Sequence, residues 1–284
     1  MSRIVYVNGD YLPEGDAKVS VFDRGFLFAD GVYEVTSVLN RKLVDFDGHT
    51  ARLQRSLDAL DIKAPVNRDE LLQIHRQLVT RNQIEDGLVY LQITRGPADR
   101  DFVYPKDATP SLVIFTQSKP GFANSPQAGT GWTIITVEDL RWGRRDIKTT
   151  QLLYPSMAKM MAKAAGADDA WLVEQGKITE GTSNNAYIVK NGVIITRELS
   201  NDILHGITRA AVLRMAVSAQ MRIDERPFTL AEAQAAEEAF ITSASNFVMP
   251  VVEIDGEKIG DGTPGPVARR LREIYIDESR RTAI

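Results

Sequence analysis

The chain has 284 residues, of which 43% are hydrophobic and 25% charged, with a net charge of −4. These proportions are typical of globular proteins and exclude a disordered chain, and the length predicts about two domains. The acidic balance argues against sequence-independent binding to nucleic acid, which depends on Lys and Arg neutralising phosphates.

The sequence contains no cysteine and only three histidines, His49, His75 and His205. Disulfide scaffolds, thiolate zinc sites and cysteine nucleophiles are therefore excluded, and the histidine spacing predicts no metal centre. The first residues, MSRIVYVNGD, lack a long apolar core and indicate a strand rather than a signal peptide. No stretch approaches the ~20 apolar residues of a membrane helix, so we expect a cytoplasmic protein that does not enter a membrane.

Two-residue turn signals predict three β-hairpins. Asn8-Gly9 lies within a predicted hairpin over residues 3–12, and the same signal recurs at Asn191-Gly192 and Asp255-Gly256 between strand-forming runs. Much of the sheet structure is therefore expected to be antiparallel or mixed.

Apolar residues at helical spacing predict helices between the strands. Within residues 49–60, for example, Leu53, Leu57 and Leu60 fall on one helix face. The same interpretation gives helices over residues 69–81, 155–165, 208–220, 230–239 and 266–278.

A stretch rich in Gly, Pro, Ser and Asn, SKPGFANSPQAGTG, follows a predicted strand over residues 111–117. Such a composition holds neither a strand ladder nor a helix and favours a linker between domains. We therefore predict a small N-terminal α/β domain over residues 1–118, a linker over 119–128 and a larger, strand-rich α/β domain over 129–284.

Four polar stretches could carry chemistry, and each also has an ordinary structural interpretation. Glu180 precedes a strand in a run of hydroxyl and amide residues, as turns often do. Gly206 and Thr208 open a predicted helix, where free N–H groups can hold a phosphate or Thr208 can simply cap the helix. Ser243 follows a strand among small residues, as in phosphate-binding loops and in many turns. Lys148 lies in a basic run, and most lysines are solvated.

In combination, these stretches follow one another in the order and spacing of a known signature. Glu180, Ile194-Ile195-Thr196 and Leu204-x-Gly206-Ile207-x-Arg209 resemble the class IV aminotransferases, the fold type IV pyridoxal-phosphate enzymes. The resemblance covers essentially the whole chain and includes residues 23–26 and 28–34, His49-x-x-Arg52-Leu53, and residues 146–148 with Leu152-Leu153. It implies a two-domain α/β enzyme of fold type IV, similar to D-amino acid aminotransferase, with pyridoxal 5′-phosphate as its cofactor.

The resemblance implies a role for each candidate residue. Lys148 would bind the cofactor aldehyde covalently and move the substrate proton, which requires an amine of depressed pKa. Glu180 would keep the pyridine nitrogen protonated, so that the ring can accept electrons. The other implied cofactor contacts are those of Arg52, Ile207, Thr208, Ser243 and Ala244 with the 5′-phosphate and of Leu204 with a ring face.

Two features indicate the subgroup within this family. Leu152-Leu153 resembles the paired leucines of D-amino acid aminotransferases, where branched-chain enzymes tend to have Asn-Tyr. Tyr33 and Arg100 resemble the trap that binds the substrate carboxylate in the D-enzymes, with residues of the neighbouring subunit taking part. Phe102 stands where that pattern often has a histidine, which leaves room for altered specificity, including amines without a carboxylate.

The resemblance therefore implies a homodimer with active sites near the subunit interface. It would move an amino group from D-alanine or a related D-amino acid to a 2-oxo acid, such as 2-oxoglutarate or pyruvate, by a ping-pong mechanism. The alternatives are a branched-chain L-amino acid aminotransferase, an (R)-selective amine aminotransferase and, less favoured, an aminodeoxychorismate lyase. A phosphate-binding module without catalysis is the alternative outside enzymes.

Overall fold

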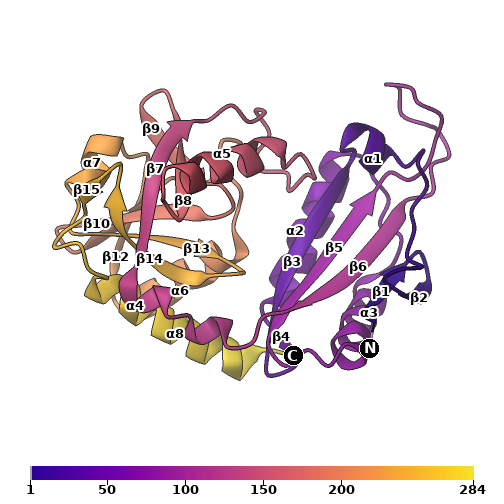
Figure 1. The fold of residues 1–284 in the computed structure, drawn as a ribbon, viewed down its shortest axis with the longest axis horizontal. Coiled ribbons are helices and arrows are strands. Elements are labelled where there is room, and N and C mark those ends of the chain that lie inside the picture. Colours follow the sequence, from indigo (N-terminus) through magenta and orange to yellow (C-terminus); the bar gives the residue numbers. More distant parts are fainter. Residues whose placement is uncertain (1) are drawn as a thin grey trace. The chain divides into compact units, whose positions relative to one another are not determined.

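The computed structural model describes residues 2–284, which form two compact units (Figure 1). The first unit contains residues 2–122, 147–151 and 282–284, and the second contains residues 123–146 and 152–281. The chain thus enters the second unit at Ala123 and returns to the first unit for five residues around Lys148.

The first unit is built on six strands. They are β1 (Ile4–Val7), β2 (Asp10–Pro13), β3 (Gly31–Leu39), β4 (Lys42–Leu43), β5 (Gly87–Thr94) and β6 (Ser111–Ser118). All neighbouring pairs in this sheet are antiparallel, in the order β2-β1-β6-β5-β3-β4.

Two long helices, α2 (Phe46–Ala59) and α3 (Arg68–Arg81), pack against this sheet, and a short helix, α1 (Arg24–Phe28), precedes β3 (Figure 1). The helices and alternate strand residues, such as Leu57, Leu78, Val89 and Leu91, form the hydrophobic core. Residues on β5 between those core positions are only half-buried, so one face of the sheet keeps accessible side chains.

The second unit is built on a nine-stranded mixed sheet. Its strands are β7 (Trp132–Glu138), β8 (Asp169–Glu174), β9 (Lys177–Gly181), β10 (Asn185–Lys190), β11 (Val193–Thr196), β12 (Arg222–Glu225), β13 (Glu238–Ser243), β14 (Phe247–Ile254) and β15 (Glu257–Lys258). The order is β12-β11-β10-β13-β14-β7-β8-β9, with β15 paired to β14. The β11–β12, β14–β7 and β7–β8 pairs are parallel.

Helical segments precede, connect and follow the strands of this sheet. They are η1 (Phe122–Asn124), α4 (Gln127–Thr130), α5 (Leu153–Ala164), α6 (Ile207–Ser218), α7 (Leu230–Gln234) and α8 (Pro266–Thr282). The core between them contains large buried side chains, among them Trp171, Phe228 and Ile241.

The predicted hairpins are confirmed. Strands β1–β2, β10–β11 and β14–β15 pair across the expected turns. The first turn residues Asn8, Asn191 and Asp255 have positive φ angles of 49°, 51° and 51°, which Asn and Asp tolerate better than most residues.

Two expectations need correction. The helix predicted over residues 230–239 ends at Gln234, because Glu238–Ser243 pairs as β13 between two other strands. The linker composition predicts no helix, but η1 and α4 lie within that stretch. Pro126, at the N-cap of α4, already has helical backbone angles of φ −56° and ψ −30°, which the proline ring favours, and Gly131 ends the helix with a φ of 80° that glycine adopts readily.

Candidate active site

The backbone around Lys148 is fixed by the first unit. Tyr33 N donates to Lys148 O at 3.0 Å, and Thr150 N donates to Gly31 O at 3.1 Å, so residues 148–150 lie along the edge of β3. From the other side, Lys148 N donates to Ser56 Oγ at 3.3 Å. The position of Lys148 is therefore set by its main chain, which leaves its side chain available for chemistry.

The Lys148 amine lies against a row of aromatic rings. Its Nζ is 4.0 Å from the centroid of the Tyr33 ring. Tyr33 stacks on Tyr90 with 5.6 Å between the ring centroids, and Tyr90 stacks on Phe115 at 4.7 Å. Burial raises the pKa of Tyr90 to about 12, and its hydroxyl donates to Gln92 Oε1 at 2.8 Å. Among residues 2–284, no carboxylate forms an ion pair with Lys148 Nζ.

Arg52 of α2 forms a buried cluster with Glu34 of β3. Its Nε and Nη2 donate to the two Glu34 oxygens at 2.7 Å each, and His49 Nδ1 lies 2.7 Å from Glu34 Oε2. Burial would raise the pKa of Glu34, but Arg52 and His49 overcome it and lower the value to about 2. Glu34 therefore fixes the Arg52 guanidinium, and the only sequence signal for this partnership is the place of both residues in the family motif.

Arg100 lies at the surface of the first unit, in the loop after β5. Its guanidinium carbon is 5.4 Å from the centroid of the Phe28 ring and 5.7 Å from that of Phe102. Phe102 is 78% exposed. Arg24 holds this loop to α1 by donating to the Asp101 carbonyl. Two exposed or partly exposed rings, rather than a carboxylate, therefore surround the Arg100 side chain.

Glu180 is a buried carboxylate in the second unit, on β9. Arg141 Nη1 donates to its Oε1 at 2.6 Å, and Oε2 accepts from Leu204 N at 3.1 Å and Asn185 Nδ2 at 3.0 Å. Burial is the largest influence on Glu180 and raises its pKa, although Arg141 and the Leu204 N–H act in the opposite direction. The carboxyl group is thus oriented by three donors while its proton affinity is increased.

Arg141 is shared between two carboxylates. Its Nε and Nη2 donate to Asp139 at 2.9 and 2.7 Å, while Nη1 serves Glu180. Asp139 also accepts from Thr179 Oγ1 at 2.7 Å, and Arg141 holds its pKa below the usual range in spite of burial. A basic run is usually solvated, but the Arg141 side chain is only 13% exposed. Arg141 was therefore missed in the sequence analysis. The only signal for it in the sequence is Asp139, two positions earlier.

The start of α6 provides uncapped N–H groups. The N-cap is Gly206, which supplies no side-chain hydrogen bond, and so Thr208 is not the cap of this helix. A side chain at Gly206 would clash, because an added Cβ would lie 2.1 Å from Asn185 Oδ1. With Ile207 as the first helical residue, the free N–H groups and the helix dipole favour an anion here.

A hydroxyl-rich turn joins β13 to β14 in the same unit. Ser243 Oγ accepts from Asn246 N at 3.1 Å and lies 3.4 Å from Ser245 Oγ, and Ala244 between them is half-buried. Asn185, which donates to Glu180, pairs with Thr242 in the sheet. The turn therefore begins at the residue directly after the partner of Asn185.

The predicted site residues are divided between the two units. Lys148, Tyr33 and Arg52 belong to the first unit, as does Arg100 on its surface loop. The group in the second unit consists of Glu180, Leu204, Ile207, Thr208, Ser243 and Ala244.

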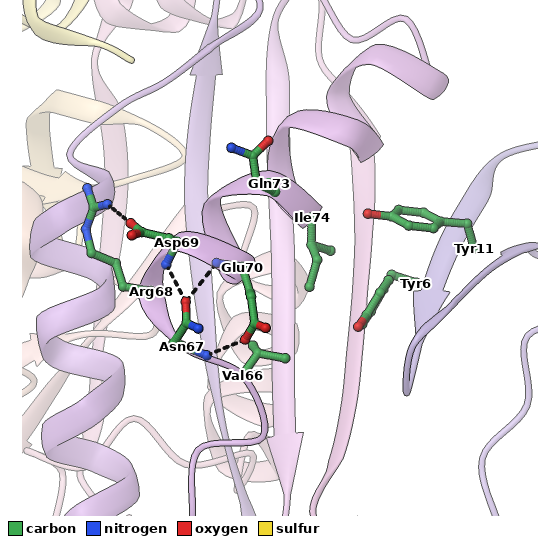
Figure 2. Close-up of a pocket in the computed structure, with 9 residues that line it drawn as sticks. All are labelled: Tyr6, Tyr11, Val66, Asn67, Arg68, Asp69, Glu70, Gln73 and Ile74. Atoms are coloured by element: carbon green, nitrogen blue, oxygen red, sulfur yellow. Dashed lines mark hydrogen bonds and ion pairs between the residues drawn. The ribbon is translucent and has the colours of Figure 1, made fainter.

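A separate groove lies at the start of α3 (Figure 2) and contains none of these residues. Its polar groups largely complete the helix cap: the Asn67 side chain accepts from Asp69 N and Glu70 N, and Glu70 accepts from Asn67 N. The remaining lining residues are Tyr6, Tyr11, Val66, Arg68, Gln73 and Ile74. This groove therefore has no part in the candidate active site.

Residues 2–284 contain neither a cluster of metal ligands nor a membrane-spanning helix. No three or more His, Asp or Glu side chains gather in a way that could hold a metal ion. None of the helices in this range combines the length and apolar character needed to span a membrane.

Comparison with known proteins places these residues in a family. The family model described as amino-transferase class IV matches residues 31–254. The D-alanine aminotransferase of Staphylococcus aureus is 38% identical over 270 residues, which are 95% of each chain, and that of Bacillus licheniformis is 39% identical over 94% of each chain.

Solved structures of branched-chain amino acid aminotransferases share the fold. One with pyridoxamine 5′-phosphate has a TM-score of 0.91 at 27% identity, covering 99% of this chain and 95% of the other. That of Thermoproteus uzoniensis with norvaline has a TM-score of 0.87, also at 27% identity, covering 97% of this chain and 94% of the other. The chain therefore belongs to the class IV aminotransferases, which are pyridoxal 5′-phosphate enzymes.

Proposed function

We propose that this enzyme transfers the amino group of D-alanine, or of a related D-amino acid, to a 2-oxo acid such as 2-oxoglutarate or pyruvate. The observation that carries the proposal is the 38–39% identity to D-alanine aminotransferases over nearly the whole chain. The structurally similar branched-chain enzymes described above are only 27% identical. Leu152-Leu153 after the lysine supports the same subgroup.

The residues present suit each part of pyridoxal phosphate. An anionic phosphate suits the uncapped start of α6 and the Ser243 hydroxyl. A basic ring nitrogen suits the buried Glu180 carboxyl group, and an aldehyde suits the amine of Lys148, which lies against an aromatic ring. When bound, the cofactor supplies an aldehyde that condenses with amines and a ring that accepts the electrons of the broken Cα–H bond.

Lys148 has two tasks in this proposal. Its Nζ would hold the cofactor aldehyde and would receive and return the proton of the substrate Cα. The hydrogen bonds of the Lys148 main chain to Tyr33 and Ser56 limit where that amine can move. Fixed geometry of this kind favours proton transfer because less ordering is needed at the moment of reaction.

Glu180 holds a proton against the ring nitrogen in this proposal. Arg141, Asn185 and Leu204 N orient its oxygens, and burial raises its pKa toward that of a group that can share a proton. Leu204 also contributes its side chain to a ring face. Arg52, Ile207, Thr208, Ser243 and Ala244 are the proposed phosphate contacts.

We further propose a homodimer in which Tyr33 and Arg100 bind the substrate carboxylate, with residues of the neighbouring subunit completing each site. Exposed apolar side chains support such an assembly. Phe22 and Phe26 beside the Arg100 loop are 54% and 73% exposed, and Leu153 on α5 is 77% exposed. Large exposed apolar side chains such as these are typical of interaction surfaces.

A chain without cysteine needs no oxidising compartment, which supports a cytoplasmic location.

A half-reaction screen tests the proposed function. Holoenzyme is mixed with D- and L-alanine, D- and L-glutamate, L-leucine and an (R)-amine, and loss of the cofactor's visible absorbance is followed. We expect D-alanine to react at least ~100-fold faster than L-leucine, since the wrong enantiomer loses the charged partner of its carboxylate. Lys148→Ala should abolish the reaction, whereas Lys163→Ala, at an exposed position on α5, should not. Faster reaction of L-leucine would instead support a branched-chain enzyme.

Arg100→Ala tests the carboxylate trap. Removing the charged partner of a buried carboxylate costs about 2–5 kcal/mol, so activity on D-alanine should fall by roughly 30-fold or more. Activity on a carboxylate-free (R)-amine should fall much less, and the exposed Arg76→Ala should change neither. Equal losses on both substrates would contradict the trap.

A further inference from the structure

Arg272 is a buried arginine of α8 that binds main-chain carbonyl groups. Its Nη1 donates to Asn246 O and Val248 O, both at 2.7 Å, and its Nη2 donates to Ala123 O at 2.9 Å. The residue is 8% exposed. One guanidinium thus binds the carbonyl groups on both sides of Phe247, at the end of the turn that joins β13 to β14.

The charge of Arg272 has no carboxylate partner within residues 2–284. Loss of hydration is the only influence on its pKa, which falls to about 10, so the group stays protonated at neutral pH. Burying a charge without a counter-ion is costly, and three carbonyl dipoles compensate only in part. The Phe247 ring, 5.7 Å from the guanidinium carbon, adds only a weak cation–π contact. The positive charge of Arg272 is therefore left without a full partner among the residues that the structure describes.

The turn that Arg272 holds is the proposed phosphate turn. Phe247 has a φ of 60°, a strained value for an aromatic residue, and its ring packs 5.8 Å from that of Tyr275, also on α8. Asn246, whose carbonyl Arg272 binds, donates from its N and Nδ2 to Ser243 Oγ at 3.1 and 3.3 Å. Through these bonds, Arg272 fixes the direction of the Ser243 hydroxyl.

We propose that Arg272 is a positioning residue for the cofactor phosphate, which both clamps the turn at residues 243–247 and attracts the phosphate with its buried positive charge. The inference rests on the proposed phosphate site. A charge that acts through low-dielectric protein, without contact, still contributes over several ångströms. The missing counter-ion of Arg272 is then the phosphate dianion, which arrives only with the cofactor.

Apoenzyme titrations measure the effect without relying on catalysis. Each variant is titrated with pyridoxal 5′-phosphate and with pyridoxal, which lacks the phosphate. The dissociation constant of pyridoxal divided by that of pyridoxal 5′-phosphate reports phosphate recognition. We expect Arg272→Gln, which removes the charge but keeps donors, to reduce this ratio about tenfold. Arg272→Lys should keep it within about threefold, and Arg270→Gln, at an exposed position on the same helix, should leave it unchanged. Ser243→Ala serves as the comparison for a direct contact.

Each outcome decides the proposal. An unchanged ratio in Arg272→Gln, with a reduced ratio in Ser243→Ala, would overturn the role of Arg272 and leave the phosphate site standing. Unchanged ratios in both would overturn the role of Arg272 together with the Ser243 contact. Equal weakening of both ligands in Arg272→Gln would show a purely structural role. If Arg272→Gln does not fold, Arg272→Lys decides, because a ratio lost despite the retained charge would refute the electrostatic part.

Discussion

Two buried clusters of arginine and carboxylate, one in each unit, have opposite effects on their glutamates. Glu34 accepts two bonds from Arg52 and lies against His49, and its pKa falls to about 2. Glu180 also lies against a guanidinium, at 2.6 Å from Arg141 Nη1, yet its pKa is raised. Both side chains are at most 4% exposed, so burial alone does not separate them.

The difference lies in how each cation divides its hydrogen bonds. Arg52 donates two bonds to Glu34, and His49 adds a further donor. Arg141 donates two bonds to Asp139 and one to Glu180, and the nearby Asp139 charge itself raises the pKa of Glu180. A cation that meets a carboxylate with two bonds keeps it ionised, whereas a cation shared with a second carboxylate orients a carboxyl group and leaves it able to exchange a proton.

Glu34→Gln should have the largest effect on stability. Loss of the carboxylate leaves Arg52 buried without its counter-ion, and breaking such a pair lowers the free energy of unfolding by about 3–5 kcal/mol. Glu85→Gln is the matched control, because Glu85 pairs with Arg41 at the same 2.7 Å but is 63% exposed, and such pairs contribute at most about 1 kcal/mol. Urea unfolding at pH 7 measures both.

The pH dependence of Glu34→Gln gives a second check on the same comparison. Because the folded pKa of Glu34 lies below its ordinary value of 4.5, its ionisation stabilises the fold above pH 4.5. That contribution is lost as the pH falls from 4.5 toward about 2, so the difference between wild type and variant should shrink in this range. A pH-independent difference, or equal costs for Glu34→Gln and Glu85→Gln, would contradict an ionised buried pair.

Glu180→Gln should instead affect catalysis more than stability. The amide keeps hydrogen bonds to Asn185 and Leu204 but cannot hold the ring proton by charge. We expect the D-alanine half-reaction to slow by about a thousandfold, or about 4 kcal/mol of transition-state stabilisation. The loss of stability should be smaller than in Glu34→Gln, because Arg141 keeps its two bonds to Asp139. Glu174→Gln, which loses a partly exposed pair with Arg145, should react at nearly the wild-type rate. An unchanged half-reaction would leave Glu180 with a structural role alone, as the acceptor of hydrogen bonds from Arg141, Asn185 and Leu204.

Arg52→Ala tests whether Arg52 binds the cofactor phosphate in addition to its partner Glu34. A lost charge-assisted hydrogen bond of about 1.5–3 kcal/mol would weaken binding of pyridoxal 5′-phosphate by about 10- to 100-fold, as measured by apoenzyme titration. Pyridoxal should be affected much less. If the two ligands respond alike while stability falls, Arg52 acts only as the partner of Glu34.

Local signals predicted much of the fold. Asn-Gly and Asp-Gly pairs located three hairpins, and leucine spacing located α2 and α3 to within a few residues. The exception at α7 has a long-range cause: the alanine-rich run at residues 230–239 suits a helix, but β13 pairs with β10 and β14 and takes its last residues.

The site was less accessible to local reasoning. The roles of Lys148 and Glu180 came from the spacing of a whole signature, because periodicity alone distinguishes neither from other charged residues. Arg141 was missed because its partner Glu180 lies 39 residues further along the chain. A basic run gives no sign that the fold will bury one member of it between two carboxylates, so pairings of this kind require the tertiary structure.

The smallest expected effect concerns His75. This histidine is buried like His49, but it has no carboxylate partner equivalent to Glu34 among residues 2–284. His75 is 2% exposed, lies edge-on to Phe46, and its Nδ1 is 2.8 Å from Leu71 O, so the neutral ring with a proton on Nδ1 fits the site. Burial is the main reason that its pKa falls to about 4, and the charge of His49 acts in the same direction.

Between pH 6.5 and about pH 4, His75 is therefore protonated in the unfolded chain but neutral in the folded chain. Stability from this group is present above pH 6.5 and decreases as the pH falls, by about 2 kcal/mol between about pH 7 and pH 5. His75→Asn keeps an amide donor for Leu71 O but cannot titrate, so its free energy of unfolding should fall less over this range than that of the wild type. Denaturant unfolding at pH 7, 6 and 5 measures the difference, and His205→Asn, at a half-buried histidine, is the control. If wild type and His75→Asn lose stability in parallel, the acid sensitivity belongs to other groups and His75 is protonated as readily in the fold as outside it.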